Sequence, residues 1–149
     1  KNWMFANSIH LIDYFSLLCR FKYKKISTNI FKIGKKVKFL VSVINYSSGD
    51  IGIYHAYWNR PAPWKVTVSC EESFYTLSPL ETLIEKNNKG QQILYKQDDI
   101  DKKFKPGFFS MINEFINAYY KKKNRLVTID ENLKTMKLID NIYKNAKFK

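Results

Sequence analysis

The chain has 149 residues, of which 45% are hydrophobic and 16% aromatic, so it is long enough to bury a core and too apolar to resemble disordered proteins. Its formal net charge is +13, from 26 basic and 13 acidic residues, a balance typical of proteins that bind nucleic acid or an anionic surface. Only Arg20, Arg60 and Arg125 are arginines, however, and arginine is the side chain best suited to phosphates and bases. A solvated Lys-rich surface is therefore favoured over a nucleic-acid site.

The first predicted element is a short amphipathic helix over residues 8–19. Its apolar residues recur three positions apart and share one face: Ile9, Ile12 and Phe15. Asn7 or Ser8 is expected to cap the first turn, because both side chains carry an oxygen that accepts a hydrogen bond from a backbone N–H. A basic connector over residues 20–25 follows.

From residue 36 the apolar period changes to two, which predicts strands. The first two predicted strands, 37–44 and 51–58, are joined by the turn Ser47–Asp50. Pro61 and Pro63 end this hairpin, because proline has no N–H to donate to a sheet. Three further strands are predicted at residues 64–70, 74–77 and 92–96. Together these give about five strands in an antiparallel meander with one apolar face.

The last third of the chain is helical by its apolar spacing. One predicted helix starts at Phe108 and is closed by Lys121–Lys123, where cations suit the negative end of the helix dipole. Thr128 and Glu131 form a capping-box pattern that begins a second helix. The order of elements predicts an α+β fold, a mostly antiparallel open sheet with helices on one face and the other face available for oligomerisation. All 149 residues are expected to form a single domain.

Neither the cysteines nor the histidines show a metal-binding spacing. Cys19 and Cys70 each lie in an apolar pattern, which predicts small buried side chains and a reducing, cytoplasmic compartment. No apolar run approaches the length of a membrane span, and residues 1–6 lack the apolar region of a signal peptide. No membrane partner is therefore expected.

Histidine is the commonest general acid or base near neutral pH, and the chain has two. His10 lies in the first turn of the first predicted helix, with Asp13 three residues later on the same side, where its carboxylate would orient the ring or raise its basicity. A histidine at a helix start is more often a cap or a core residue when no partner is known. His55 lies in the middle of a predicted strand, and a half-buried sheet residue is the favoured interpretation.

Aromatic side chains gather around the proline break between the predicted hairpins. This group could be a stacking platform for a sugar or a base, or a subunit interface, and the interface is favoured. Its members are Tyr54, Tyr57, Trp58 and Trp64.

Three segments together resemble the C-terminal, substrate-side domain of the Gfo/Idh/MocA oxidoreductases, a family that includes glucose–fructose oxidoreductase and inositol dehydrogenase. The first, Asn7–Asp13, is similar to the family's H-x-x-D helix start. The second runs from Gly52 through Trp58-Asn59-Arg60-Pro61 and Val66 to the Pro79-Leu80-Glu81 motif. The third comprises Lys105–Phe108, Phe115-Ile116, Thr128-Ile129 and Met136–Ile139, and is similar to the family's closing helices.

The resemblance implies a catalytic role for His10, which would assist proton transfer beside the nicotinamide ring and the reacting hydroxyl carbon. Asp13 matches the family's aspartate and is expected to hold local structure, and Asn7 and Asp13 are the expected substrate-binding residues. Many members of the family have an aspartate four residues before the histidine, where this chain has Ala6. Asn7 is expected to take over some of the missing hydrogen bonding.

The family's N-terminal Rossmann domain, with its Gly-rich turn and E-K-P motif, has no counterpart in these residues, and NAD(P) binding needs that turn. The expected function is therefore the substrate-binding and oligomerisation part of an NAD(P)-dependent sugar, nucleotide-sugar or cyclitol oxidoreductase, inactive as this chain alone. The resemblance further implies a homo-oligomer through the open sheet face. Two alternatives stay open: a basic module that binds nucleic acid or an acidic glycan, and an oligomerisation domain that has lost catalysis.

Overall fold

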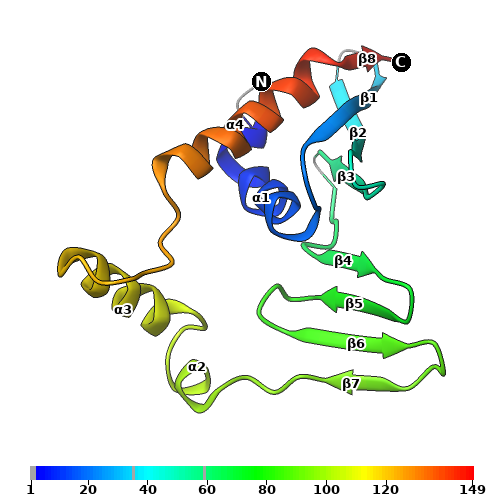
Figure 1. Cartoon of the computed structure of the whole chain (residues 1–149). Coiled ribbons are helices and arrows are strands. Elements are labelled where there is room, and N and C mark those ends of the chain that lie inside the picture. The colour runs from blue at the N-terminus through cyan, green and yellow to red at the C-terminus, as the bar shows by residue number, and fades with distance from the viewer. Residues whose placement is uncertain (1–2, 35, 59) are drawn as a thin grey trace. The chain divides into compact units, whose positions relative to one another are not determined.

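The computed structural model describes residues 3–34, 36–58 and 60–149 of the chain. Asn59, which belongs to the second resembling segment, lies outside the described residues. The chain divides into two units, each described by itself below (Figure 1). Unit 1 comprises Lys1–Pro63 and Asp130–Lys149, and unit 2 comprises Trp64–Ile129.

Unit 1 is built on a four-stranded sheet in the order β3-β2-β1-β8. Its strands are β1 (Tyr23–Ile33), β2 (Lys36–Tyr46), β3 (Ile51–Tyr57) and β8 (Ala146–Phe148). The pairs β1–β2 and β2–β3 are antiparallel, whereas the C-terminal β8 pairs with β1 in parallel. Residues alternate strictly between buried and exposed along β3, as expected for a sheet that is covered on one face.

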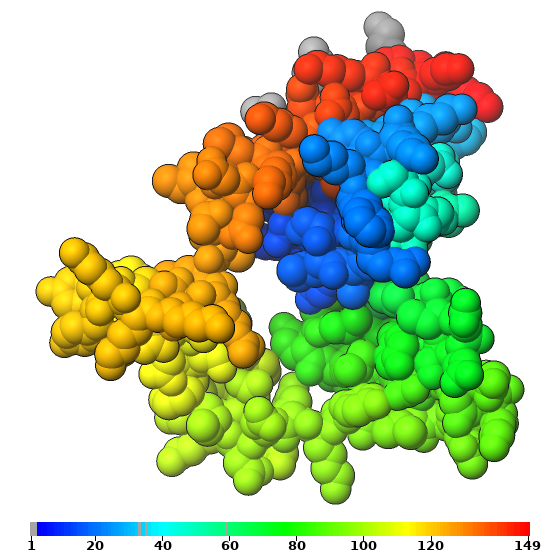
Figure 2. All heavy atoms as spheres, viewed as in Figure 1, coloured from blue at the N-terminus to red at the C-terminus, as the bar shows by residue number. Residues whose placement is uncertain are grey.

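Helices cover one face of this sheet. A π-helical turn (Met4–Ser8) leads directly into α1 (Ile9–Leu18), and α4 (Ile129–Lys144) comes from the other end of the chain. Figure 2 shows the orange-to-red C-terminal residues packed against the blue N-terminal ones. The core between helices and sheet is apolar, as the hydrophobic effect requires. Its fully buried apolar members are Met4, Ile12, Leu40, Ile44, Ile139 and Ile142.

A glycine allows α1 to approach the sheet closely. A Cβ atom on Gly52 of β3 would lie 2.7 Å from Cε1 of Phe15, which is closer than real contacts allow. Ala56 is on the same covered face and is also small. Small side chains on the covered face of β3 therefore make room for α1.

Unit 2 contains an antiparallel sheet in the order β4-β5-β6-β7 and two helices. The strands are β4 (Val66–Ser69), β5 (Ser73–Leu77), β6 (Leu83–Asn87) and β7 (Gln92–Leu94), and the helices are α2 (Asp99–Lys103) and α3 (Phe108–Tyr119). After α3, Lys121 adopts a left-handed conformation and its N–H donates to the Ala118 carbonyl. The basic run therefore ends this helix, as predicted. No described residue of unit 2 is fully buried.

The predicted α+β fold is confirmed, with open, mostly antiparallel sheets and helices on one face of the unit 1 sheet. The number and arrangement of strands were predicted wrongly. The connector predicted at residues 20–25 runs into β1, and none of β1, β6, β8 and α2 was predicted from the sequence. The strands also form two sheets in place of one meander. β8 has only three residues and depends on pairing with β1, so no local pattern marks it.

Candidate functional site

The candidate site lies at the start of α1, where the sequence predicted it. His10 is the second residue of the helix and its side chain is exposed. Asn7 precedes it in the π-helical turn and is exposed too, whereas Asp13 is half-buried. π-Helical turns are rare, and many of those known lie at functional sites. The contacts of this segment are therefore informative.

Ser8 does not cap α1, contrary to the prediction. Its side chain is buried and accepts a hydrogen bond from the Tyr54 hydroxyl on β3, with an O–O distance of 2.5 Å. Burial raises the pKa of Tyr54 to about 12, and the hydrogen bond to Ser8 opposes that rise. The π-helical turn is thus bonded directly to the sheet.

The Asp13 side chain is hydrogen-bonded to α4. The Thr135 hydroxyl donates to Oδ1 of Asp13 at 2.5 Å, across 122 residues of sequence. Within the part of the chain that the structure describes, no hydrogen bond or ion pair joins Asp13 to His10. The prediction that Asp13 orients the imidazole ring is therefore wrong for this structure. Its carboxylate holds the helix that carries His10.

A third contact joins the same segment to α4 at Tyr143. A hydrogen bond from the backbone of Met4 lowers the pKa of Tyr143, but burial has the larger effect and raises it. The residues before and after His10 are therefore tied to β3 and α4. No sequence motif marks Tyr54 or Thr135 as partners of this segment. The nearest signal is that Tyr54 alternates with the exposed residues of β3.

The four aromatic residues predicted as an interface do not share one surface. Tyr54 is buried under the helices, and Trp58 packs against the core, with its ring centroid 5.0 Å from that of Trp3. Trp64 belongs to unit 2. Only Tyr57 lies on the open face of the unit 1 sheet, because residues along a strand alternate between faces. The open face instead carries an aromatic row of Phe31, Phe39, His55 and Tyr57.

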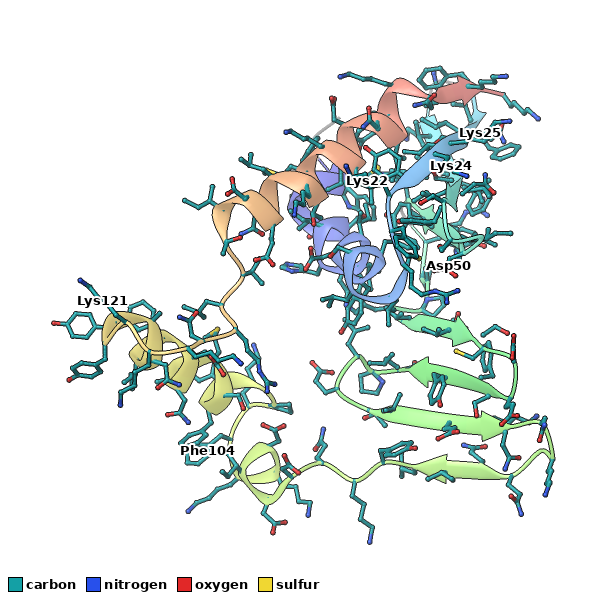
Figure 3. The ribbon with its side chains drawn as sticks, in the orientation of Figure 1. Lys22, Lys24, Lys25, Asp50, Phe104 and Lys121 are labelled. Atoms are coloured by element: carbon teal, nitrogen blue, oxygen red, sulfur yellow. The ribbon has the colours of Figure 1, made fainter. Side chains whose placement is uncertain are left out.

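Lysines gather at the start of β1, beside a tightly bonded turn. Lys22, Lys24 and Lys25 are exposed (Figure 3). Nearby, Arg20 forms an ion pair with Asp50 at 2.7 Å, and its hydrogen bonds hold the pKa of that carboxyl well below its usual range. The pair is solvent-exposed on the Arg20 side, so it orders the turn more than it stabilises the fold.

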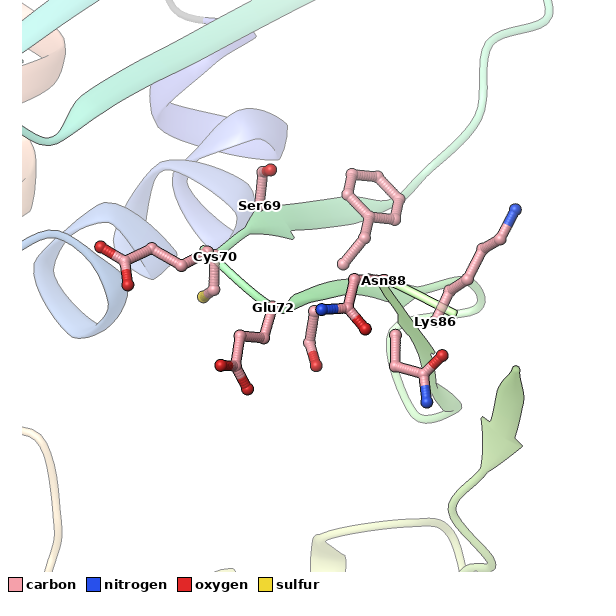
Figure 4. A pocket seen from close by; sticks show the side chains of 9 residues that line it. Ser69, Cys70, Glu72, Lys86 and Asn88 are labelled. Atoms are coloured by element: carbon pink, nitrogen blue, oxygen red, sulfur yellow. The ribbon is translucent and has the colours of Figure 1, made fainter. Parts of the chain in front are cut away.

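The burial of the two cysteine side chains differs from the prediction. Cys19 is half-buried, and burial raises the pKa of its thiol. Cys70 is exposed, which corrects the prediction of a buried side chain. It lines a shallow hollow at the β4–β5 turn together with Ser69, Glu72, Lys86 and Asn88 (Figure 4). None of the residues predicted for the site lines this hollow.

The described residues do not fit a dinucleotide. Dinucleotide sites need a Gly-rich turn between a strand and a helix. Of the glycines, only Gly107 directly precedes a helix, and it follows α2 and Pro106, not a strand.

Among residues 3–34, 36–58 and 60–149 no cluster of His, Cys, Asp and Glu could hold a metal ion. In the same residues, no helix is both long and apolar enough to cross a membrane.

Unit 1 is expected to lose stability above pH 10, with Tyr54 as one contributor beside Tyr46 and Tyr143, whose pKa values burial also raises. The folded state raises the pKa of the Tyr54 hydroxyl from 10.0 to about 12, so the stabilisation is complete below pH 10 and is lost between pH 10 and 12, where the unfolded form ionises and the folded form stays protonated. One such group changes the free energy of unfolding by at most about 1.4 kcal/mol per pH unit. Urea unfolding at pH 9, 10 and 11 measures the slope. Tyr54→Phe should reduce it, and an unchanged slope in that variant would contradict the assignment.

No family model matches the sequence, and no curated protein sequence matches it. Solved structures do match the fold. UDP-N-acetylglucosamine 3-dehydrogenase GnnA from Acidithiobacillus ferrooxidans has a TM-score of 0.76 at 11% identity, over 93% of this chain and 45% of that chain. Aldose-aldose oxidoreductase from Caulobacter crescentus has a TM-score of 0.73 at 12% identity, over 92% and 43%.

KijD10, a 3-ketoreductase from Actinomadura kijaniata in complex with TDP-benzene and NADP, has a TM-score of 0.68 at 9% identity. The match covers 97% of this chain and 48% of that one. The chain therefore spans somewhat less than half the length of the proteins it matches. At these identities the likeness concerns the fold. It confirms, for the fold, the resemblance to one part of the Gfo/Idh/MocA-type oxidoreductases.

Proposed function

We propose that the chain is the C-terminal, substrate-side domain of an NAD(P)-dependent oxidoreductase that acts on a CH–OH group of a sugar, nucleotide sugar or cyclitol. The observation that carries this proposal is the fold match, which extends over nearly the whole chain and covers less than half of each oxidoreductase. In this proposal both units belong to that domain. The cofactor would be held by residues outside these 149, because none of the described residues suits it.

Within that domain, His10 is the proposed catalytic residue. It is exposed at the start of a helix that is bonded on both sides to buried neighbours, so a substrate could reach a ring held in a defined place. A neutral imidazole would take the proton of the substrate hydroxyl as the carbon is oxidised, and return it in the reverse direction. Asn7, one helical turn earlier, is the proposed donor to a substrate oxygen. Asp13 is proposed to serve the substrate through Oδ2, since Oδ1 is bonded to Thr135.

We further propose that the open face of the unit 1 sheet packs against a second copy of the protein. Its aromatic row continues into two exposed isoleucines of β3, Ile51 and Ile53. Contiguous exposed apolar surface of this kind marks interaction sites. The residues proposed for this contact are thus Phe31, Phe39, Ile51, Ile53 and Tyr57, in place of the four predicted from the sequence.

An activity measurement on the full-length gene product tests the function. Absorbance at 340 nm follows NAD(P)H while UDP-sugars, free aldoses and cyclitols are offered as substrates. We expect turnover with a member of one of these classes, and neither turnover nor NADH binding by the 149-residue chain. Micromolar NADH binding by the chain alone, measured by fluorescence titration, would contradict the proposal that the cofactor is held by residues outside these 149. Failure of every substrate class in the full-length protein would contradict the function.

The second candidate is a basic module for nucleic acid or an acidic glycan. Exposed Lys22, Lys24 and Lys25 at the start of β1 favour it. Binding driven by phosphates weakens steeply as salt rises, because counterions are released. Titration of the chain with labelled DNA between 50 and 200 mM salt therefore separates the two functions. A tight complex with a steep salt slope would replace the oxidoreductase proposal.

A further inference from the structure

The segment that carries His10 is held by one hydrogen bond on each side of the histidine, a buried one before it and a part-buried one after it. Two residues before it, Ser8 Oγ accepts from the Tyr54 hydroxyl of β3 at 2.5 Å. Three residues after it, Asp13 Oδ1 accepts from the Thr135 hydroxyl of α4 at 2.5 Å. Ser8, Tyr54 and Thr135 are 1%, 5% and 3% exposed, so water is excluded from the Tyr54–Ser8 bond and, at the bond to the half-buried Asp13, from the donor side.

These two hydrogen bonds fix the orientation of the segment, which the apolar core does not. Met4 and Ile12 hold the segment against the sheet, but hydrophobic contact is non-directional and leaves a helix free to roll about its axis. Successive helical residues are about 100° apart, so a small roll changes where an exposed side chain points. A hydrogen bond weakens steeply when its angle departs from linearity. Two such bonds, to β3 and to α4, fix the roll of the first turn.

The polar chemistry of the two hydrogen bonds also indicates that they position the segment. A buried hydroxyl without a partner costs about 1–3 kcal/mol, so polar side chains at these places are a stability risk that apolar ones would avoid. Buried polar pairs are retained in some proteins because they specify one arrangement among several. The rare π-helical turn immediately before Ile9 needs such specification, since an ordinary α-helical turn competes with it.

We propose that Thr135 is a positioning residue for His10: through Asp13, it sets the direction in which the imidazole projects from α1. Tyr54 does the same from β3 through Ser8. That this direction serves catalysis rests on the proposed function, whereas the effect on His10 itself does not. Thr135 lies 122 residues from Asp13, so the C-terminal helix controls the geometry of a site near the start of the chain.

The experiment observes His10 directly by NMR on the 149-residue chain. The chain has two histidines, so the ring Cε1–Hε1 region contains two signals, and His55 on the open sheet face serves as an internal reference. Thr135→Val removes the donor with little change of shape, and Thr135→Ser keeps it. Thr28→Val is the matched control, because the Thr28 hydroxyl is also buried and also bonded, to Ser42 at 2.8 Å on the sheet.

We expect Thr135→Val to shift or broaden the His10 signal without moving that of His55, and Thr135→Ser to restore it. Thr28→Val should lower the urea midpoint and leave the His10 signal in place. An unmoved His10 signal in folded Thr135→Val would overturn the proposal and leave Thr135 a structural residue. Should Thr135→Val fail to fold, Thr135→Cys replaces it, because a thiol is a weak donor and must then move the same signal. Since no turnover is measured, this result is independent of the proposed function.

Discussion

Replacement of Ile139 by alanine is expected to lower the free energy of unfolding of unit 1 by about 2–5 kcal/mol. Ile139 is 0% exposed and lies on α4, in the core between that helix and the sheet. Truncation removes buried methyl groups and leaves a cavity that the neighbouring strands cannot fill without moving. Natural domains are stable by only about 5–15 kcal/mol, so this one change would remove a large share of the total.

The measurement needs a probe that reports on unit 1 alone. Trp3 and Trp58 pack against each other in unit 1, whereas Trp64 is in unit 2. Urea unfolding followed by tryptophan fluorescence in a Trp64→Phe background therefore isolates the relevant transition. Met136→Ala, on the same helix and 42% exposed, is the matched control and should cost distinctly less. Equal losses for the two variants would show that α4 does not pack as described.

Replacement of His10 by alanine is expected to lower turnover of the full-length protein by roughly a hundredfold or more, if the imidazole transfers the proton. His10 is exposed, so the loss of its side chain should leave the unfolding transition almost unchanged. The rate and the urea midpoint are measured on the same preparation. A large fall in rate with an unchanged midpoint would identify a catalytic effect.

Ser16→Ala is the matched control for this variant. Ser16 is an exposed polar residue of the same helix, and its hydroxyl donates to the backbone carbonyl of Asp13. Its removal should change neither the rate nor the midpoint appreciably. An unchanged rate in His10→Ala would support the alternative of an oligomerisation domain that has lost catalysis.

Much of the fold could be predicted from local pattern. The period of two along residues 37–44 and 51–58 predicted β2 and β3, and the apolar spacing predicted α1, α3 and α4 within a few residues. The position of His10 at a helix start followed from the same spacing. These features are local, because neighbouring residues determine which side of a helix or strand is apolar.

Alternation alone did not decide which face of the sheet the helices cover. Both faces of β3 carry large apolar or aromatic side chains, with Tyr54 on one and Ile53 and Tyr57 on the other. Alternation therefore assigns residues to two faces without indicating which one is buried. Tyr54, which was predicted to lie on the open face, is on the covered face for this reason. Gly52 and Ala56 mark the covered face by their size, and that signal was available.

The sequence by itself determined the α+β class, the three longer helices α1, α3 and α4, most of the strands and the place of His10. Only the tertiary structure decided the parallel pairing of β8 with β1, the bond from Tyr54 to Ser8 and the bond from Thr135 to Asp13. Each of these joins residues far apart in the chain, so each depends on how the folded chain returns on itself. Local periodicity does not predict such contacts, because it reflects only the packing of near neighbours.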